Sequence, residues 1–156
     1  MAENQDYMTG ITSTVNIAGH PVHPMLVPFP ITFLVSALLT DIVYWRTLHD
    51  FWARASFWLI VAGVVAGLLA GLTGAIDYLT IQRAREHRAG KIHAAGNITA
   101  VILAAINLAI RWGDREASIL WTGLLLSLII AAILTVTGWY GGELTFRHKI
   151  GVIEHE

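Results

Sequence analysis

Four long apolar stretches dominate the chain, and none of them contains an aspartate, glutamate, lysine or arginine. They cover about residues 24–40, 55–76, 94–110 and 117–142. A helix needs about 20 mostly apolar residues to cross the hydrocarbon core of a bilayer. The second and fourth stretches reach that length alone, and the other two reach it once a flanking charged residue is counted. No stretch alternates between apolar and polar positions, so the pattern indicates helices and not strands.

These stretches predict an all-α membrane protein, a four-helix transmembrane bundle of up-down-up-down topology with both termini on the same side. We expect the helices at about residues 28–45, 53–85, 91–112 and 118–146. Residues 20–149 would form the membrane domain, between a polar N-terminal tail (1–19) and a short C-terminal tail (150–156). A soluble bundle is the alternative, but its helices would need polar outer faces that these segments do not offer.

The composition limits which partners and cofactors the chain can bind. Hydrophobic residues make up 55% of the 156 residues and charged residues only 13%, against about 25% charged in a typical soluble domain. The net charge of −1 argues against a nucleic-acid partner and leaves the lipid bilayer as the partner that the composition indicates. There is no cysteine, so disulfides, covalently attached haem and thiolate metal sites are excluded.

The predicted topology places most of the histidines at one membrane surface. Both tails and the connection between helices 2 and 3 share a side, which carries His20, His23, His87, His93, His148 and His155. Only His49 falls on the other side. The histidine-rich side also carries six of the ten lysine and arginine residues. By the positive-inside rule this excess favours termini in the cytoplasm.

Three predicted helices carry a stripe of small and polar residues. Polar groups avoid lipid and small residues let helices approach closely, so we expect the stripes to face the bundle interior. The stripe of helix 3 comprises His93, Asn97, Ala100, Ala104 and Asn107. The stripe of helix 2 comprises Gly63, Gly67, Ala70, Gly74 and Asp77, and that of helix 4 comprises Ser127, Ala131, Gly138, Gly142 and Thr145, with His148 at its edge. Packing alone is the simpler explanation of such stripes; the further prediction is that His93, Asp77 and His148 converge.

The segment "HPVHP" begins the membrane domain, with His20 and His23 each followed by a proline. Proline fixes its own φ and pushes the preceding residue toward an extended backbone. Both imidazoles therefore lie on a restricted backbone at the mouth of the bundle and are candidate ligands. Alternatively, the His-Pro pairs only end regular structure before the membrane.

Two aspartates lie near the ends of predicted helices. Asp77 could orient a neighbouring imidazole, or it could cap a helix or pair with an arginine. Asp41 lies toward the opposite end of the bundle, where Arg46 and Arg54 are its candidate partners.

These motifs resemble those of a bacterial membrane-protein family catalogued as domain of unknown function 2231. The resemblance rests on "HPVHP" before helix 1, "GAIDY" at the end of helix 2, His93 at the start of helix 3 and "GWYGGELTFRHKIGV" at the end of helix 4. It extends from Gly19 to Val152. It implies a small four-span protein of the bacterial inner (cytoplasmic) membrane. Some members of this family look as though they are joined to iron–sulfur domains. This association implies a redox function for the chain as well.

The histidines suit a b-type haem, which can lie between bundle helices with two axial imidazoles. His93 would be one ligand and either His23 or His148 the other, and glycines would make room for the porphyrin. The protein would then be an electron carrier, in contact with quinone, an iron–sulfur protein or a larger redox membrane complex. The candidate cofactor-binding residues are His20, His23, His93, His148, Asp77, Asn97, Gly74 and Gly138.

Two other functions remain open. A non-haem iron, copper or zinc ion would take His23, His93 and His148 as its principal ligands, with His20 and either Asp77 or Glu143 available. A cofactor-free accessory or scaffold subunit of a larger membrane complex would need none of them. No constellation of catalytic residues appears, so electron transfer or an accessory role is favoured over enzymatic activity.

Overall fold

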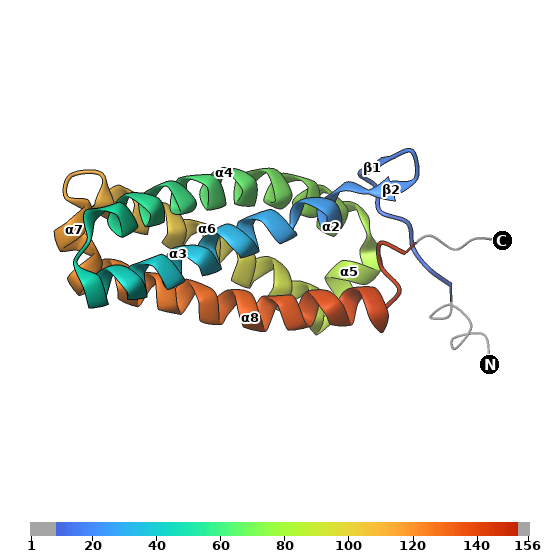
Figure 1. The fold of residues 1–156 in the computed structure, drawn as a ribbon. Helices are drawn as coiled ribbons and strands as arrows, with labels where there is room; N and C mark the ends of the chain where they lie inside the picture. The colour runs from blue at the N-terminus through green and yellow to red at the C-terminus, as the bar shows by residue number, and fades with distance from the viewer. Residues whose placement is uncertain (1–8, 153–156) are drawn as a thin grey trace.

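The computed structural model describes residues 9–152, which include a short hairpin and a bundle of long helices (Figure 1). In the hairpin, β1 (Asn16–Ile17) pairs antiparallel with β2 (His20–Pro21). Ala18 and Gly19 form its turn at positive φ, 49° and 81°, a conformation that two-residue hairpin turns require. Residues 1–8 and 153–156 of the two predicted tails, among them His155, lie outside the described residues.

Four helical segments within residues 9–152 are long and apolar enough to cross a membrane, which confirms the predicted all-α membrane protein. The first is α2 (Val22–Leu26) followed by α3 (Pro28–Thr47), and the second is α4 (Asp50–Thr80). The short α5 (Gln82–Glu86) leads into the third, α6 (Arg88–Arg111). The fourth comprises α7 (Arg115–Ser118), the π-helical turn η1 (Ile119–Gly123) and α8 (Leu124–Phe146).

The long helices lie side by side, with the hairpin and α5 at one end of the bundle and α7 at the other (Figure 1). The described chain enters and leaves the bundle at the α5 end. Large apolar side chains cover the outer faces, among them Leu68, Leu72, Ile102 and Leu128, each more than half exposed. Such faces suit contact with lipid, and the bundle therefore belongs in a bilayer.

Two helix boundaries differ from those predicted. Helix 1 begins with α2, before the predicted start at residue 28, because Val27 keeps helical backbone angles and joins α2 to α3. The helix predicted for residues 53–85 divides at Ile81, whose backbone is extended (φ −91°, ψ 104°). The Ile81 side chain is buried, and α4 ends there although sequence periodicity alone would continue it.

The buried residues of the spans recur at intervals of alternately four and three residues. On α3 they are Pro30, Leu34, Ala37, Asp41 and Tyr44. On α6 the same spacing joins Ala100, Ala104, Asn107 and Arg111, and on α8 it joins Ser127, Ile130, Leu134 and Thr137. This seven-residue repeat is typical of helices that pack at small crossing angles in four-helix bundles.

The repeat corrects the predicted inner face of helix 4. A seven-residue repeat drifts by about 20° per heptad from the face of a straight helix. Over the length of α8 this drift makes Thr137 the buried residue and leaves Gly138 exposed. Gly138 therefore faces away from the bundle, and a Cβ atom at that position would meet nothing within 4 Å. It cannot make room for a cofactor in the bundle interior.

Candidate functional site

Two imidazoles from distant parts of the chain meet at the α5 end of the bundle. His23 lies on α2 and His93 lies near the start of α6. Their ring centroids are 6.1 Å apart and their planes are nearly perpendicular, at 89°. The structure thus brings together two of the histidines that the sequence singled out, and we call them the His23–His93 pair.

Each ring of the pair is fixed by a main-chain carbonyl on a neighbouring helix. Nδ1 of His23 lies 2.8 Å from the carbonyl oxygen of Ala70 on α4, and Nδ1 of His93 lies 2.9 Å from that of Thr137 on α8. A carbonyl oxygen only accepts hydrogen bonds, so each Nδ1 must carry the proton. In the neutral imidazole, Nε2 is then left with a free lone pair.

The two Nε2 atoms are available to a ligand. Neither has a hydrogen-bond partner among residues 9–152, whereas every fully buried side-chain nitrogen or oxygen in that range has one. The Nε2 atoms are therefore not sealed inside the protein. Histidines that bind metals usually donate Nδ1–H to a carbonyl or carboxylate in this way, which fixes the tautomer and aims Nε2 at the metal.

Two glycines provide the space that the rings occupy. A Cβ atom on Gly74 of α4 would lie 2.6 Å from Cε1 of His23. A Cβ atom on Gly141 of α8 would lie 2.9 Å from Cε1 of His93. The sequence predicted Gly74 as space for a porphyrin, but in the structure the imidazole itself fills that space.

Alanine at Gly141 is expected to displace the His93 ring, because the methyl group would overlap the imidazole. Alanine is more favourable than glycine inside a helix by about 1 kcal/mol, so the substitution stabilises α8 itself and the protein should still fold. Two-dimensional NMR of histidine side chains in detergent would report the loss of the His93 Nδ1 hydrogen bond. Gly138→Ala on the same helix is the matched control, with free space at its Cβ. An unchanged His93 ring in Gly141→Ala would contradict the close packing described above.

Asn97 supports the His93 side of the pair from one turn further along α6. Its Nδ2 donates to the carbonyl oxygen of His93 at 2.8 Å, and its Oδ1 accepts from the Thr137 hydroxyl at 3.3 Å. Thr137 is the residue whose carbonyl binds the His93 ring. Asn97 therefore couples α6 to α8 close to His93.

The structure places the other two candidate histidines elsewhere. His20 lies in the exposed hairpin, with Nδ1 3.1 Å from the carbonyl oxygen of Ala18. His148 lies beyond the end of α8 and stacks on His87, with ring centroids 3.8 Å apart and planes at 23°. Its Nε2 is 3.9 Å from Glu143. No group of three or more His, Asp or Glu residues that could hold a metal ion occurs within the described part of the chain.

The stacked position of His148 makes the packing of the C-terminal segment sensitive to pH. Burial, followed by the neighbouring His87, lowers the pKa of His148 below its usual 6.5. The unfolded segment thus binds a proton more readily than the folded one, so stability rises with pH and is lost as the pH falls through about 6.5. The hydrogen-exchange protection factors of the backbone amides of residues 143–152, corrected for the intrinsic exchange rate at each pH, should therefore fall on acidification. A His148→Phe variant keeps an aromatic ring and should lose this dependence; an unchanged pH profile would contradict the assignment.

Asp77 contacts the N-terminal segment and not an imidazole. Its Oδ2 accepts a hydrogen bond from the Ser13 hydroxyl at 2.6 Å. Its Oδ1 accepts from the backbone N–H groups of Thr14 at 2.8 Å and Val15 at 3.1 Å. The carboxylate is therefore bound by the chain that precedes the hairpin.

A second polar group lies inside the bundle, and sequence reasoning did not find its centre. Arg111 and Asp41 are both fully buried and form a bidentate ion pair, in which Nη1 of Arg111 donates to Oδ1 of Asp41 and Nη2 donates to Oδ2, each at 2.7 Å. Around them, Ser56 and Ser127 hydroxyls donate to Asp41 at 2.5 and 2.6 Å. All four spans contribute to this group, which we call the buried ion cluster: Asp41, Ser56, Asn107, Arg111 and Ser127.

The expected partners of Asp41 were wrong. Arg46 is exposed and lies against Trp45, and Arg54 pairs with Asp50 at 3.2 Å. The actual partner, Arg111, was counted as a surface cation because it follows an apolar stretch. The buried spacing of α6 runs from Asn107 directly to Arg111, so the stripe of helix 3 extended by four residues would have found it.

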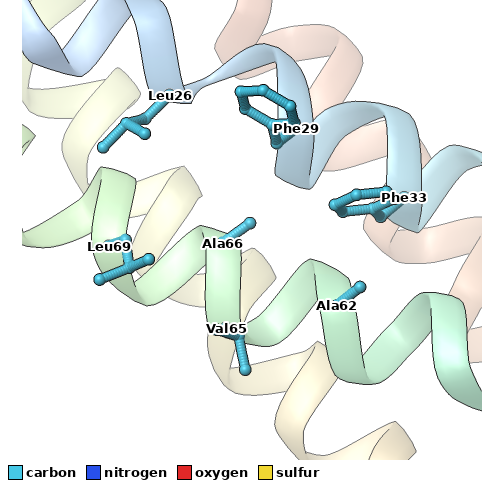
Figure 2. Close-up of a pocket in the computed structure, with 7 residues that line it drawn as sticks. All are labelled: Leu26, Phe29, Phe33, Ala62, Val65, Ala66 and Leu69. Carbon is cyan, nitrogen blue, oxygen red and sulfur yellow. The ribbon is translucent and has the colours of Figure 1, made fainter.

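An apolar groove lies between α3 and α4 (Figure 2). Phe29 and Phe33 border it on one side, and Ala62 and Ala66 on the other. Its lining contains no polar side chain, and the facing Leu69 is more than half exposed. The groove is therefore a surface for hydrocarbon chains and supplies no chemical group to the histidine site.

The comparisons with known proteins bear on this fold through one family model. Residues 19–154 match the model described as predicted membrane protein (DUF2231). Neither the comparison with curated proteins nor that with solved structures gave a match. The matched segment begins at the hairpin, includes all four spans and contains both residues of the His23–His93 pair. The chain therefore belongs to the DUF2231 family of membrane proteins.

Proposed function

We propose that the protein is an electron carrier that binds one b-type haem through the His23–His93 pair. The main support for this proposal is the number of nitrogen atoms that can bind a metal. The pair supplies two nitrogens with free lone pairs, and the described residues offer no third protein ligand. A zinc or non-haem iron site usually needs three or four protein ligands. A haem brings four nitrogens of its own and needs only two axial ligands.

The geometry of the pair fits this donor set. Two imidazoles that bind opposite faces of one ion, with metal–nitrogen distances of about 2.0 Å, have ring centres about 6 Å apart. The observed separation is 6.1 Å. Because both rings are already fixed by carbonyls of α4 and α8, binding would cost them little conformational freedom.

A haem bound there would supply reversible one-electron chemistry. The chain itself would provide two things: the nitrogens of His23 and His93 that hold the haem, and a fixed tautomer for each. An electron carrier also needs a donor and an acceptor. We propose a lipid-soluble quinone and a redox protein of the same membrane, such as an iron–sulfur protein or a larger complex, as these partners.

Absorption spectroscopy of the purified protein tests the proposal. The protein would be produced in a bacterial host supplied with a haem precursor and purified in detergent. We expect a Soret band that shifts on reduction, and about one haem per chain by the pyridine haemochromogen assay. A colourless protein that also fails to take up added haemin would overturn the proposal. Elemental analysis showing stoichiometric zinc, copper or iron without a Soret band would favour the metal-ion alternative.

We further propose that the α5 end faces the cytoplasm of a bacterial inner membrane. This end carries six cationic residues: Arg83, Arg85, Arg88, Lys91, Arg147 and Lys149. The opposite end carries Arg46, Arg54 and Arg115, because Arg111 is buried in the ion cluster. Excess positive charge marks the cytoplasmic side. A green fluorescent protein fused to the C-terminus should therefore fluoresce, whereas an active alkaline phosphatase fusion at that position would contradict this orientation.

A further inference from the structure

The contacts of Asp77 connect it to His23 through the main chain. Asp77 Oδ1 accepts from the Val15 N–H at 3.1 Å. The carbonyl oxygen of Val15 accepts from the N–H of Val22 at 3.0 Å, and Val22 directly precedes His23. Two hydrogen bonds, through Val15, thus connect the carboxylate to Val22, the first residue of α2, which carries the imidazole.

One face of α4 provides several of the contacts that fix this segment. Ala70 provides the carbonyl for the His23 ring, and Gly74 provides the space for it. Asp77, one turn further, binds the residues before the hairpin. Thr80, almost another turn on, has its hydroxyl 2.7 Å from that of Thr14. The stripe at these four positions of α4 is a docking surface for the N-terminal segment, and not only a packing surface between helices.

We propose that Asp77 is the positioning residue of His23: by anchoring Ser13, Thr14 and Val15, it sets where the hairpin and α2 begin and therefore where the His23 imidazole lies. A carboxylate suits this role because its two oxygens accept several hydrogen bonds at once, here from Ser13, Thr14 and Val15. The segment has a second attachment two residues earlier, where Ile11 exchanges backbone hydrogen bonds with Lys149 and Gly151, whereas the hairpin itself is exposed. The consequence for ligand binding rests on the proposed haem function.

Two variants of Asp77 test which of its hydrogen-bonding oxygens the anchoring needs. Asp77→Ala removes both acceptors and should release the segment. Asp77→Asn keeps the oxygen that binds the Thr14 and Val15 N–H groups and should restore most of the anchoring. Thr135→Val on α8 is the matched control, because its hydroxyl donates to the Ala131 carbonyl of its own helix and takes no part in the contacts of the N-terminal segment. Circular dichroism would verify that each variant retains its helices.

The first readout is a distance, and it needs no cofactor. The chain contains no cysteine, so spin labels can be attached at Asn16→Cys and Leu72→Cys, both exposed positions. We expect a narrow distance distribution in the parent protein, Asp77→Asn and Thr135→Val, and a broad one in Asp77→Ala. A narrow distribution in Asp77→Ala would overturn the inference, whether or not the protein binds haem.

The second readout is the ligation state of added haemin. Loss of groups that orient a metal ligand typically weakens binding by about 10–100-fold. Asp77→Ala should therefore bind haemin about 10–100-fold more weakly than the parent and show a high-spin component, with recovery in Asp77→Asn. If the distance distribution broadens while the spectrum and affinity stay unchanged, Asp77 only anchors the tail and the positioning role is refuted. If the parent binds no haemin at all, the haem proposal fails and the distance measurement alone decides the role of Asp77.

Discussion

Arg111→Met is expected to lower the free energy of unfolding by about 3–5 kcal/mol, the usual cost of removing one partner of a buried ion pair. The side chains of Arg111 and Asp41 are both fully buried. Without the guanidinium, the Asp41 carboxylate would keep only hydroxyl donors in an interior without water, and it would have to stay charged at high cost or take up a proton. Unfolding of the detergent-solubilised protein, followed by circular dichroism, would measure the loss.

The double variant separates a lost ion pair from lost packing. Replacing both partners, as Asp41→Leu with Arg111→Met, leaves no uncompensated charge, so the double variant should be more stable than Arg111→Met alone. Arg54→Met is the matched control: its partner Asp50 is exposed, and an exposed pair of this spacing contributes only about 0.3–0.5 kcal/mol. Equal losses for Arg111→Met and Arg54→Met would contradict a structural role for the buried ion cluster.

His93→Ala is expected to abolish stable haem binding, with affinity for haemin reduced more than about 100-fold, since even the groups that orient a ligand contribute 10–100-fold. His23→Ala should have a similar effect and leave at most a five-coordinate, high-spin species held by His93. Each imidazole makes one hydrogen bond to the protein, so its loss should destabilise the fold less than the loss of Arg111 and both variants should fold. Haemin titration followed by the Soret band measures these effects.

Two other histidines serve as controls for these substitutions. His49 lies at the opposite end of the bundle, at the start of α4, and His20 lies in the exposed hairpin. Alanine at either position should leave the Soret band and its reduced spectrum unchanged. Loss of haem in His20→Ala together with retention in His23→Ala would show that the wrong histidine of "HPVHP" has been assigned.

The four spans could be predicted from the sequence because each is a charge-free run of about the length that a bilayer demands. Their ends were less predictable. The second span divides at Ile81, whose side chain is buried, although sequence periodicity alone would continue the helix. The inner face of α8 was misjudged at Gly138 because a straight-helix period was applied to a helix that follows a seven-residue repeat.

The candidate site was predictable in part for a related reason. His93 lies on a regular helix stripe, and the rigid His23-Pro24 pair lies directly before the bundle, so both could be named. His148 was misassigned to the same cluster because it follows the end of α8. There Lys149 adopts a positive φ of 53° and its carbonyl accepts a hydrogen bond from the Ile11 N–H. Because the backbone is no longer helical, the helix period cannot predict the direction of the side chains there.

Arg111 shows the opposite failure, in which the pattern was present but the residue type obscured it. Its position continues the buried spacing of α6, whereas its charge suggested the membrane surface. A charged residue in phase with a buried stripe is best interpreted as one half of a pair, and the other half is sought at the same depth on the other helices. Asp41 occupies that place on α3.

Low-temperature electron paramagnetic resonance of the ferric, haem-loaded protein most directly tests whether both imidazoles of the His23–His93 pair bind one iron. With two axial imidazoles the iron is expected to be low-spin, and the signal should be lost in both His23→Ala and His93→Ala. A signal that is entirely high-spin, or a low-spin signal that persists in either variant, would contradict ligation by this pair.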